Sequence, residues 1–262
     1  MSTRTYVVTG AASGIGAATV QLLEKHGGRV IDVDLHDATV CVDLATRDGR
    51  TQLVDEVTRL TDGEVHAVIA NAGVIGTGAN DVRVNFFGAV ATLNGLRPLL
   101  ARAGNPRAVV TASQALIHAV NDDVVRACLS DDEAAAVGAL PAEPTMFDSL
   151  WIYASTKRAL ARWVRREAPT ADWAGAGIAL NAIAPGVIRT PMTEPLLADE
   201  ATTELLLAAT PMPLGGVAEP DAVAHVIEFL TSPDTVALSG QVLFIDGGGE
   251  CTLRGDDVWT TA

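Results

Sequence analysis

Short apolar segments recur along the chain and alternate with longer segments of helical spacing. Seven of them are rich in valine or isoleucine: residues 5–9, 28–34, 39–44, 64–70, 107–113, 177–184 and 240–246. They are apolar at nearly every position instead of every second one, which is typical of strands that are covered on both faces. We therefore predict a parallel sheet of seven strands between two layers of helices.

The segments between these strands predict the connecting helices. Residues 16–28 (GAATVQLLEKHGG) carry apolar residues at helical intervals and end in two glycines, which commonly stop a helix. Strands that alternate with helices favour a doubly wound, Rossmann-type α/β fold with right-handed crossovers. No linker, charge block or internal repeat divides the chain, so we predict a single dinucleotide-binding catalytic domain over residues 1–262.

Two segments interrupt the simple alternation. Residues 114–150 form an acidic, alanine-rich insertion, in which 131–140 (DDEAAAVGAL) predicts a short amphipathic helix with an acidic start. Residues 189–216 are rich in leucine, alanine, methionine and proline. This composition suits a mobile lid over an apolar substrate.

The overall charge limits the classes of molecule that the chain is expected to bind. The formal net charge is −14, with 48% hydrophobic residues and a mean hydropathy of +0.27, so the chain is neither disordered nor fibrous. Nucleic acid and anionic membranes would repel such a chain. The excess acid serves solubility or, alternatively, adaptation to high salt.

The cysteines predict neither a disulfide framework nor a metal site. Cys41, Cys128 and Cys251 are odd in number and far apart, and no histidines accompany them at metal-ligand spacing. The N-terminus shows no signal-peptide pattern, and no apolar run reaches membrane-spanning length. We expect a cytoplasmic protein without a metal.

A glycine-rich turn follows the first predicted strand. In VVTGAASGIGAA, Gly10, Gly14 and Gly16 stand where the chain must turn sharply before a helix and let a pyrophosphate approach its backbone. The motif is weak by itself. Its place between a strand and a helix favours a dinucleotide site.

Asp34 ends the second predicted strand, eighteen residues after Gly16. A carboxylate at this position accepts the ribose hydroxyls of NAD and repels the extra phosphate of NADP. Neither Leu35 nor His36 offers that phosphate a positive charge. We predict NAD as the cofactor, with Asp32 as an alternative ribose ligand or a solvated strand-edge acid.

Tyr153 and Lys157 stand four residues apart in SLWIYASTKRAL, so that they share one helix face. Lowering the tyrosine pKa from ~10 to about 7 requires about 4 kcal/mol of preferential phenolate stabilisation. The ammonium group and the positive ring of an oxidised nicotinamide could supply it in a partly dry cleft. Alone, such a pair is usually incidental.

Several motifs in the same order resemble the short-chain dehydrogenase/reductase family over nearly the whole chain. They are TGAASGIG at 9–16, NAG at 71–73, VNFFG at 84–88, VVTAS ending at Ser113, YASTK at 153–157 and IAPGVIRTPM at 183–192. The resemblance implies an oxidoreductase that interconverts a secondary alcohol and a ketone. It also implies that Tyr153 acts as general acid or base, that Ser113 binds the substrate oxygen, and that Lys157 binds the nicotinamide ribose and lowers the tyrosine pKa.

The resemblance further implies that Asn85 holds a backbone kink and a water of the proton relay. It assigns Asn71 to Gly73 to the adenosine ribose and sheet contacts, Asp43 with Leu44 to adenine, and Pro185 to Thr190 to the nicotinamide carboxamide. The implied cofactor contacts are Gly10, Ser13, Gly14, Ile15, Gly16, Asp34, Leu35, Asp43, Leu44, Asn71, Ala72, Gly73, Tyr153, Lys157, Pro185, Gly186, Ile188 and Thr190.

Each of these assignments has a purely structural alternative. Asn85 could be a helix-interior amide paired to the backbone, and Ser113 could cap the end of a strand. Asn71 to Gly73, Asp43 and Pro185 to Thr190 could be ordinary turns.

Two spacings depart from the common family pattern. Forty residues separate Ser113 from Tyr153, where about a dozen are usual, and only fourteen separate Asn71 from Asn85. Both departures also occur in the bacterial 3α-hydroxysteroid dehydrogenase/carbonyl reductase type. We expect the insertion to pack beside the substrate cleft and over the helix of Tyr153, and to alter the usual subunit contact of a homodimer or homotetramer. His118 within it is expected to be packed or exposed, not catalytic.

The substrate is expected to be an apolar alcohol or ketone, alicyclic or steroid-like, because no cluster of arginine or lysine lies in either candidate wall. An alternative function is a non-catalytic NAD-binding sensor or scaffold. The intact Ser113, Tyr153 and Lys157 argue against that alternative. A sugar-nucleotide epimerase would need a larger C-terminal region and a different glycine spacing.

Overall fold

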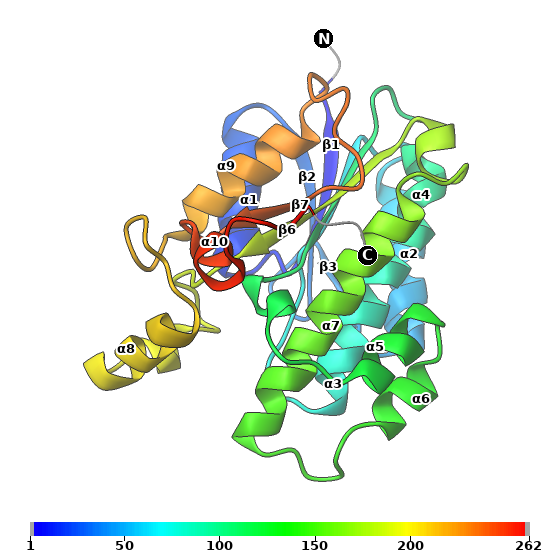
Figure 1. Cartoon of the computed structure of the whole chain (residues 1–262). Helices are drawn as coiled ribbons and strands as arrows, with labels where there is room; N and C mark the ends of the chain where they lie inside the picture. The colour runs from blue at the N-terminus through cyan, green and yellow to red at the C-terminus, as the bar shows by residue number, and fades with distance from the viewer. Residues whose placement is uncertain (1–2, 260–262) are drawn as a thin grey trace.

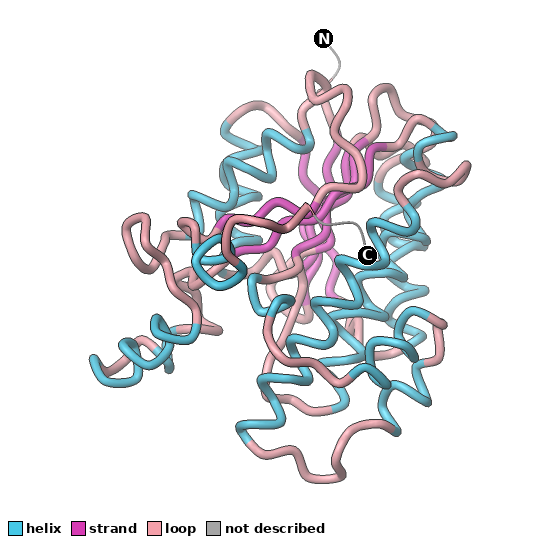
Figure 2. The backbone as a smooth tube through the Cα atoms, in the orientation of Figure 1, coloured by secondary structure: helices cyan, strands magenta, loops and turns pink. Residues whose placement is uncertain are grey.

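A computed structural model describes residues 3–259 of the chain. Its centre is a parallel sheet of seven strands in the order β3-β2-β1-β4-β5-β6-β7 (Figures 1 and 2). The strands are β1 Thr5–Thr9, β2 Arg29–Asp34, β3 Val40–Cys41, β4 Ala67–Ala70, β5 Arg107–Thr111, β6 Ala179–Pro185 and β7 Val242–Ile245. All seven predicted strands, the parallel sheet and the doubly wound fold are confirmed.

Some strands are shorter than the apolar segments that predicted them. β3, at the edge of the sheet, pairs with β2 only through Val33↔Val40 and Asp34↔Cys41. β4 begins at Ala67 although its apolar segment begins near Val65. Apolar character continues past the ends of strands wherever the adjoining residues are buried in the core, so it does not fix the ends of the ladder.

Helices cover both faces of the sheet. On one face lie α1 (Gly14–Lys25) and α9 (Pro220–Thr231), and on the other lie α2 (Arg47–Leu60), α4 (Ala89–Leu100) and α7 (Met146–Glu167) (Figure 1). Two apolar clusters fill these layers. One is built around Val8, Ile69 and Ile227, and the other around Val68, Leu96 and Leu160. The shorter helical elements are α3 Ala79–Val82, the π-helix η1 Arg83–Gly88, α5 Asp122–Leu129, α6 Glu133–Gly138, α8 Glu200–Ala209, α10 Gly249–Arg254 and the 3₁₀ turns η2 Gln114–Ile117, η3 Ala174–Ala176 and η4 Glu194–Leu196.

The insertion packs along α7, which carries Tyr153 and Lys157. Its helix α5 buries Val124 and Val125 in the larger apolar cluster. Arg158 of α7 donates hydrogen bonds to the carbonyl oxygens of Leu116 (2.5 Å) and His118 (2.7 Å). The expected position over α7 is thus what the structure shows, and the short helix predicted in 131–140 is α6.

Candidate active site

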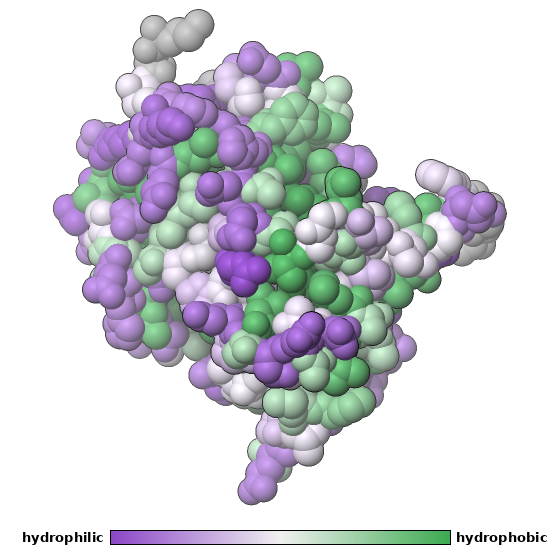
Figure 3. Space-filling view, turned by 90° about the vertical axis from the view of Figure 1, so that its left-hand side faces the viewer, coloured by the Kyte–Doolittle hydropathy of each residue, from purple (hydrophilic) through white to green (hydrophobic). Residues whose placement is uncertain are grey.

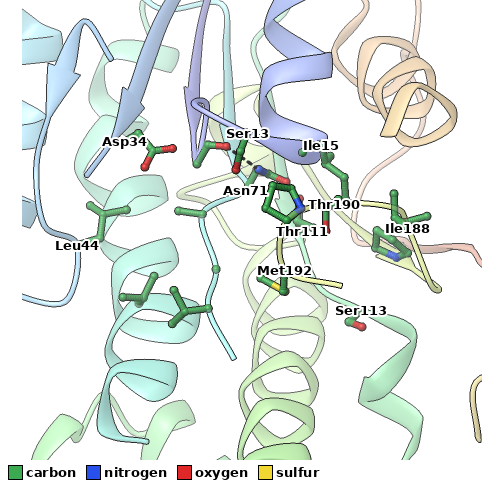
Figure 4. A pocket seen from close by; sticks show the side chains of 18 of the residues that line it. Ser13, Ile15, Asp34, Leu44, Asn71, Thr111, Ser113, Ile188, Thr190 and Met192 are labelled. Atoms are coloured by element: carbon green, nitrogen blue, oxygen red, sulfur yellow. Dashed lines mark hydrogen bonds between the residues drawn. The ribbon is translucent and has the colours of Figure 1, made fainter. Parts of the chain in front are cut away.

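The candidate active site is a cleft of about 300 Å³ at the carboxyl ends of the strands. It opens where the strand order reverses between β1 and β4, the usual ligand position in doubly wound sheets. Figure 4 shows part of the cleft lining. Eighteen of the twenty predicted site residues line the cleft: Gly10, Ser13, Gly14, Ile15, Asp34, Leu35, Asp43, Leu44, Asn71, Ala72, Gly73, Ser113, Tyr153, Lys157, Pro185, Gly186, Ile188 and Thr190. The two that do not line it are Gly16 and Asn85.

The glycine turn is shaped by close backbone packing. Gly10 (φ +69°) and Gly14 (φ +52°) adopt left-handed conformations that favour glycine. A Cβ added at Gly16 would lie 1.9 Å from the Gly10 carbonyl oxygen, so Gly16 packs beneath the turn instead of facing the cleft. Ser13 precedes α1 without a side-chain capping bond, so this residue does not occupy the amide groups at the start of the helix. Such amides favour an anionic group, and a pyrophosphate fits this position.

The two candidate ribose acids lie in different surroundings. Asp34 lines the cleft, where its carboxylate accepts hydrogen bonds from the backbone N–H groups of Ala12 (2.9 Å) and Leu35 (2.7 Å). Asp32 instead accepts from the N–H (3.0 Å) and the hydroxyl (2.5 Å) of Thr39. Asp32 is therefore engaged at the strand edge, and Asp34 is the acid available to a ligand in the cleft.

Asn71 ties the turn after β4 to its neighbours. Its side-chain N–H donates to the Gly10 carbonyl oxygen (3.4 Å), and its Oδ1 accepts from the Thr111 hydroxyl (3.0 Å) (Figure 4). The Thr9 hydroxyl oxygen accepts from the N–H groups of both Asn71 and Ala72 at 3.1 Å. This strand-end turn is thereby held rigid beside the glycine turn.

Asp43 and Thr190 are two further candidate cofactor contacts that line the cleft. Asp43 caps its own turn by accepting from the N–H of Ala45 (2.8 Å), which agrees with its structural alternative. Thr190 crosses to the glycine turn, since a Cβ added at Gly14 would lie 2.9 Å from its Cγ2 atom. Both residues also line the cleft, so a ligand there would contact them.

Ser113, Tyr153 and Lys157 meet at one wall of the cleft. The Ser113 hydroxyl lies near enough to the Tyr153 phenol to lower its pKa. The Ser113 oxygen also accepts from the N–H of Ala115 (3.2 Å) as the cap of η2, so its structural alternative holds as well. Lys157 is buried, its Nζ donates to the Thr111 carbonyl oxygen (2.8 Å), and Nζ lies 5.4 Å from the centre of the Tyr153 ring.

Burial dominates the titration of this pair. It raises the pKa of Tyr153, the nearby Ser113 hydroxyl opposes that effect, and the charge of Asp81 adds to it. Burial lowers the pKa of Lys157 to about 8, and Asp81 opposes the change. In the protein alone the pKa of Tyr153 is thus raised, and its expected lowering by Lys157 stays a prediction. The predicted contribution of an oxidised nicotinamide stays a prediction.

Asn85 holds the backbone behind the cleft. It lies fully buried in the π-helix η1, where its Oδ1 accepts from the N–H of Val74 and its Nδ2 donates to the Val74 carbonyl oxygen, both at 2.8 Å. π-Helical turns of this kind are frequent at functional sites. The kink and the pairing to backbone are both present, whereas a role in a water relay stays a prediction.

Several cleft residues were not among the predicted site residues. They are Val33, Val42, Val74, Val84, Thr111, Ala112, Pro191, Met192 and Thr193. Most directly adjoin predicted site residues, and five of them lie within the quoted motifs, so these neighbours in the sequence are the signal that could have found them. Only the first residues of the proposed lid, through Thr193, reach the cleft.

The rest of the lid segment projects from the body of the protein. Helix α8 buries none of its residues, and Leu205 is 73% exposed (Figure 1). Figure 3 views the side of the molecule from which α8 projects, and apolar surface lies there among polar groups. An exposed apolar helix beside a cleft is a reasonable lid, and its closure stays a prediction.

Metal and membrane sites were also sought within residues 3–259. No group of three or more His, Cys, Asp or Glu there could hold a metal ion, and the three cysteines are free. None of the helices in this range is long and apolar enough to cross a membrane. His118 lies partly buried in the insertion, away from the cleft, and burial and the nearby Arg158 lower its pKa.

The fold and cleft define a nucleotide-dependent oxidoreductase, and comparisons with known proteins agree. Residues 10–250 match a family model described as enoyl-(acyl carrier protein) reductase. The chain is 35% identical to 3-alpha-hydroxysteroid dehydrogenase/carbonyl reductase of Comamonas testosteroni, over 95% of this chain and 97% of that protein.

Two solved structures are also similar. The 3-alpha-hydroxysteroid dehydrogenase of Pseudomonas sp. B-0831, complexed with NADH, is 35% identical with a TM-score of 0.88, over 97% of this chain and 99% of that one. A putative NAD(P)-dependent gluconate 5-dehydrogenase of Beutenbergia cavernae, with bound NADP, is 26% identical with a TM-score of 0.74, over 94% and 96%. The chain belongs to the short-chain dehydrogenase/reductase family, and it is an oxidoreductase that acts on alcohols and ketones.

Proposed function

We propose that the protein is an NAD(H)-dependent enzyme that interconverts an apolar or alicyclic secondary alcohol and its ketone. The observation that carries this proposal is the meeting of Ser113, Tyr153 and Lys157 in the same cleft as the glycine turn and Asp34. A 3α-hydroxysteroid-like substrate is favoured within this class, because the steroid dehydrogenases are similar over nearly the whole chain.

Each polar side chain of the cleft has a separate role in the proposed reaction. The nicotinamide, when bound, supplies or accepts the hydride. In reduction, the Tyr153 hydroxyl gives its proton to the carbonyl oxygen of the substrate, and in oxidation the phenolate takes it back. Ser113 holds the same substrate oxygen by a hydrogen bond, and Lys157 binds the nicotinamide ribose and keeps positive charge near the phenol.

The proposed choice of NAD rests on Asp34. Its carboxylate lies at the end of β2 among the cleft residues, where it can accept the ribose hydroxyls and repel a 2′-phosphate. The relative solved with NADH supports this choice, whereas the gluconate 5-dehydrogenase relative was solved with NADP at low occupancy.

The proposed substrate class rests on the wall beyond Ser113. Among the described residues that line the cleft, Lys157 is the one cation, and Ile188, Pro191 and Met192 are apolar. Such a wall favours a ring of carbon atoms over a sugar phosphate, because an anionic group would lose its hydration without gaining a partner.

A substrate screen tests the proposed activity. Steroid and simple alicyclic ketones are supplied with NADH, the matching alcohols with NAD, and the nicotinamide absorbance is followed. We expect turnover of at least one apolar pair and none of a sugar phosphate. NADH binding without turnover across the panel would favour the alternative of a non-catalytic sensor or scaffold.

We also propose a cytoplasmic homo-oligomer, a homodimer or homotetramer. Three free cysteines suit a reducing compartment. Helix α5 of the insertion covers part of α7. A second subunit would therefore have to pack on another surface, so the subunit contact would differ from the usual one. Sedimentation equilibrium tests the assembly, and a monomer at micromolar concentration would contradict it.

A further inference from the structure

Asp81 is a fully buried carboxylate that none of the motifs includes. It lies in α3 and accepts hydrogen bonds from the N–H of Gly76 (3.0 Å), the N–H of Thr77 (2.9 Å) and the Thr77 hydroxyl. Burial raises the pKa of this carboxyl group, and the three donors oppose that change by favouring its ionised form. The carboxylate of Asp81 is therefore buried among hydrogen-bond donors.

The loop that Asp81 holds is a wall of the cleft. Residues 71–78 connect β4 to α3. Asn85 forms hydrogen bonds to this loop at Val74, and Asp81 accepts hydrogen bonds from it at Gly76 and Thr77. At its start the loop touches the catalytic wall: a Cβ added at Gly73 would lie 3.3 Å from Asn85 Oδ1 and 3.4 Å from Lys157 Nζ. Asp81 thus fixes the segment against which the Lys157 side chain rests.

The charge of Asp81 acts on Tyr153 and Lys157 of α7, the helix against which α3 packs. Burial raises the pKa of Asp81 and of Tyr153 and lowers that of Lys157. The charge of Lys157 opposes the change at Asp81, and the charge of Asp81 opposes the change at Lys157 and adds to the change at Tyr153. From α6, which also contacts α3, Glu133 faces Arg50 (2.6 Å) and Arg83 (3.5 Å), so those charges balance one another. Lys157 is the cation left to face Asp81 within the described chain.

We propose that Asp81 is a positioning residue that serves as the buried counter-charge of Lys157, keeping this side chain an ammonium and fixing the cleft loop beside it. The role of Lys157 in this inference rests on the proposed function. Because the same negative charge disfavours the phenolate of Tyr153, Asp81 favours the doubly protonated pair, phenol and ammonium. That is the state from which Tyr153 can donate a proton to a ketone.

The chain permits a direct test, because Lys25 and Lys157 are its two lysines. Protein labelled with ¹³C-lysine gives two Cε signals, and a Lys25→Arg background leaves that of Lys157. In this background we expect a wild-type midpoint near 8. We expect the midpoint to move to lower pH in Asp81→Asn, because burial of the ammonium is then no longer opposed by the carboxylate.

Thr77→Val is the matched control. It removes the hydroxyl donor from Asp81 and loosens the same loop, but it keeps the carboxylate, so the Lys157 midpoint should stay near the wild-type value. If Asp81 had only a structural role, both variants would have lower thermal stability and both would keep the wild-type Lys157 midpoint. That result would overturn the proposal.

A second measurement covers the case in which Asp81→Asn does not fold. In wild-type protein, the Lys157 signal should carry a second inflection at acidic pH as Asp81 takes up a proton, and its absence would also count against the proposal. Both titrations are read without substrate or cofactor. A failed substrate screen would therefore contradict the proposed function and leave the pairing of Asp81 and Lys157 to its own test.

Discussion

Replacing Tyr153 by phenylalanine is expected to slow turnover by about 10²–10⁴-fold in both directions, the usual contribution of a general acid or base. The substitution keeps the ring and removes the hydroxyl that lies near Ser113. NADH binding should change little, because the glycine turn and Asp34 are untouched. Steady-state rates with the best substrate of the screen and an NADH fluorescence titration measure the two effects separately.

Tyr6→Phe is the matched control, because Tyr6 and Tyr153 are the two tyrosines of the chain. Tyr6 lies in β1, packed in the smaller apolar cluster and outside the cleft. Its replacement should leave turnover near the wild-type rate. If Tyr153→Phe kept full activity, the assignment of the proton donor would be wrong, even with NADH binding intact.

The fold was predictable because its evidence is local. Strands such as 64–70 and 107–113 are apolar on both faces, and this pattern alone distinguishes a sheet between two helix layers from one exposed on a face. The cofactor side of the cleft was predictable for a related reason. Asp34 is the last residue of its strand, and Gly10 and Asn71 directly follow theirs, so a parallel sheet brings them to one edge whatever the details of packing.

Asp81 illustrates what the sequence could not show. In the letters GANDVRVN it resembles any acid at the start of a helix, and such acids are usually solvated. Its burial follows from the packing of α3 against α7, a contact between segments about seventy residues apart. Only the folded chain reveals that this carboxylate has three donors and a lysine nearby.

The titration of Tyr153 shows a second limit. The sequence correctly places a lysine one turn after the tyrosine, and a charge argument alone then lowers the tyrosine pKa. Whether the tyrosine pKa rises or falls depends on how far the phenol is excluded from solvent. In the folded protein, burial raises the pKa of Tyr153. Charges can be read from a sequence, whereas desolvation depends on atoms that distant segments bring together.

Replacing Asp34 by asparagine is expected to weaken NADH binding by about 10- to 100-fold, because hydrogen bonds to a charged group contribute about 1.5–3 kcal/mol. Asparagine has nearly the same shape, so one acceptor oxygen remains for Ala12 or Leu35. NADPH binding should improve at the same time, because the repulsion of its 2′-phosphate is removed. Fluorescence titrations of the two reduced dinucleotides give both affinities.

Asp32→Asn separates loss of the cleft carboxylate from loss of a strand-edge acid. Asp32 binds Thr39 through two hydrogen bonds, so its replacement should lower the stability of the β2–β3 edge and leave the ratio of NADH to NADPH affinity unchanged. A wild-type preference for NADPH would contradict the assignment of NAD. If Asp34→Asn left the ratio of NADH to NADPH affinity unchanged, the choice between the two dinucleotides would arise elsewhere in the cleft and not from the carboxylate at the end of β2.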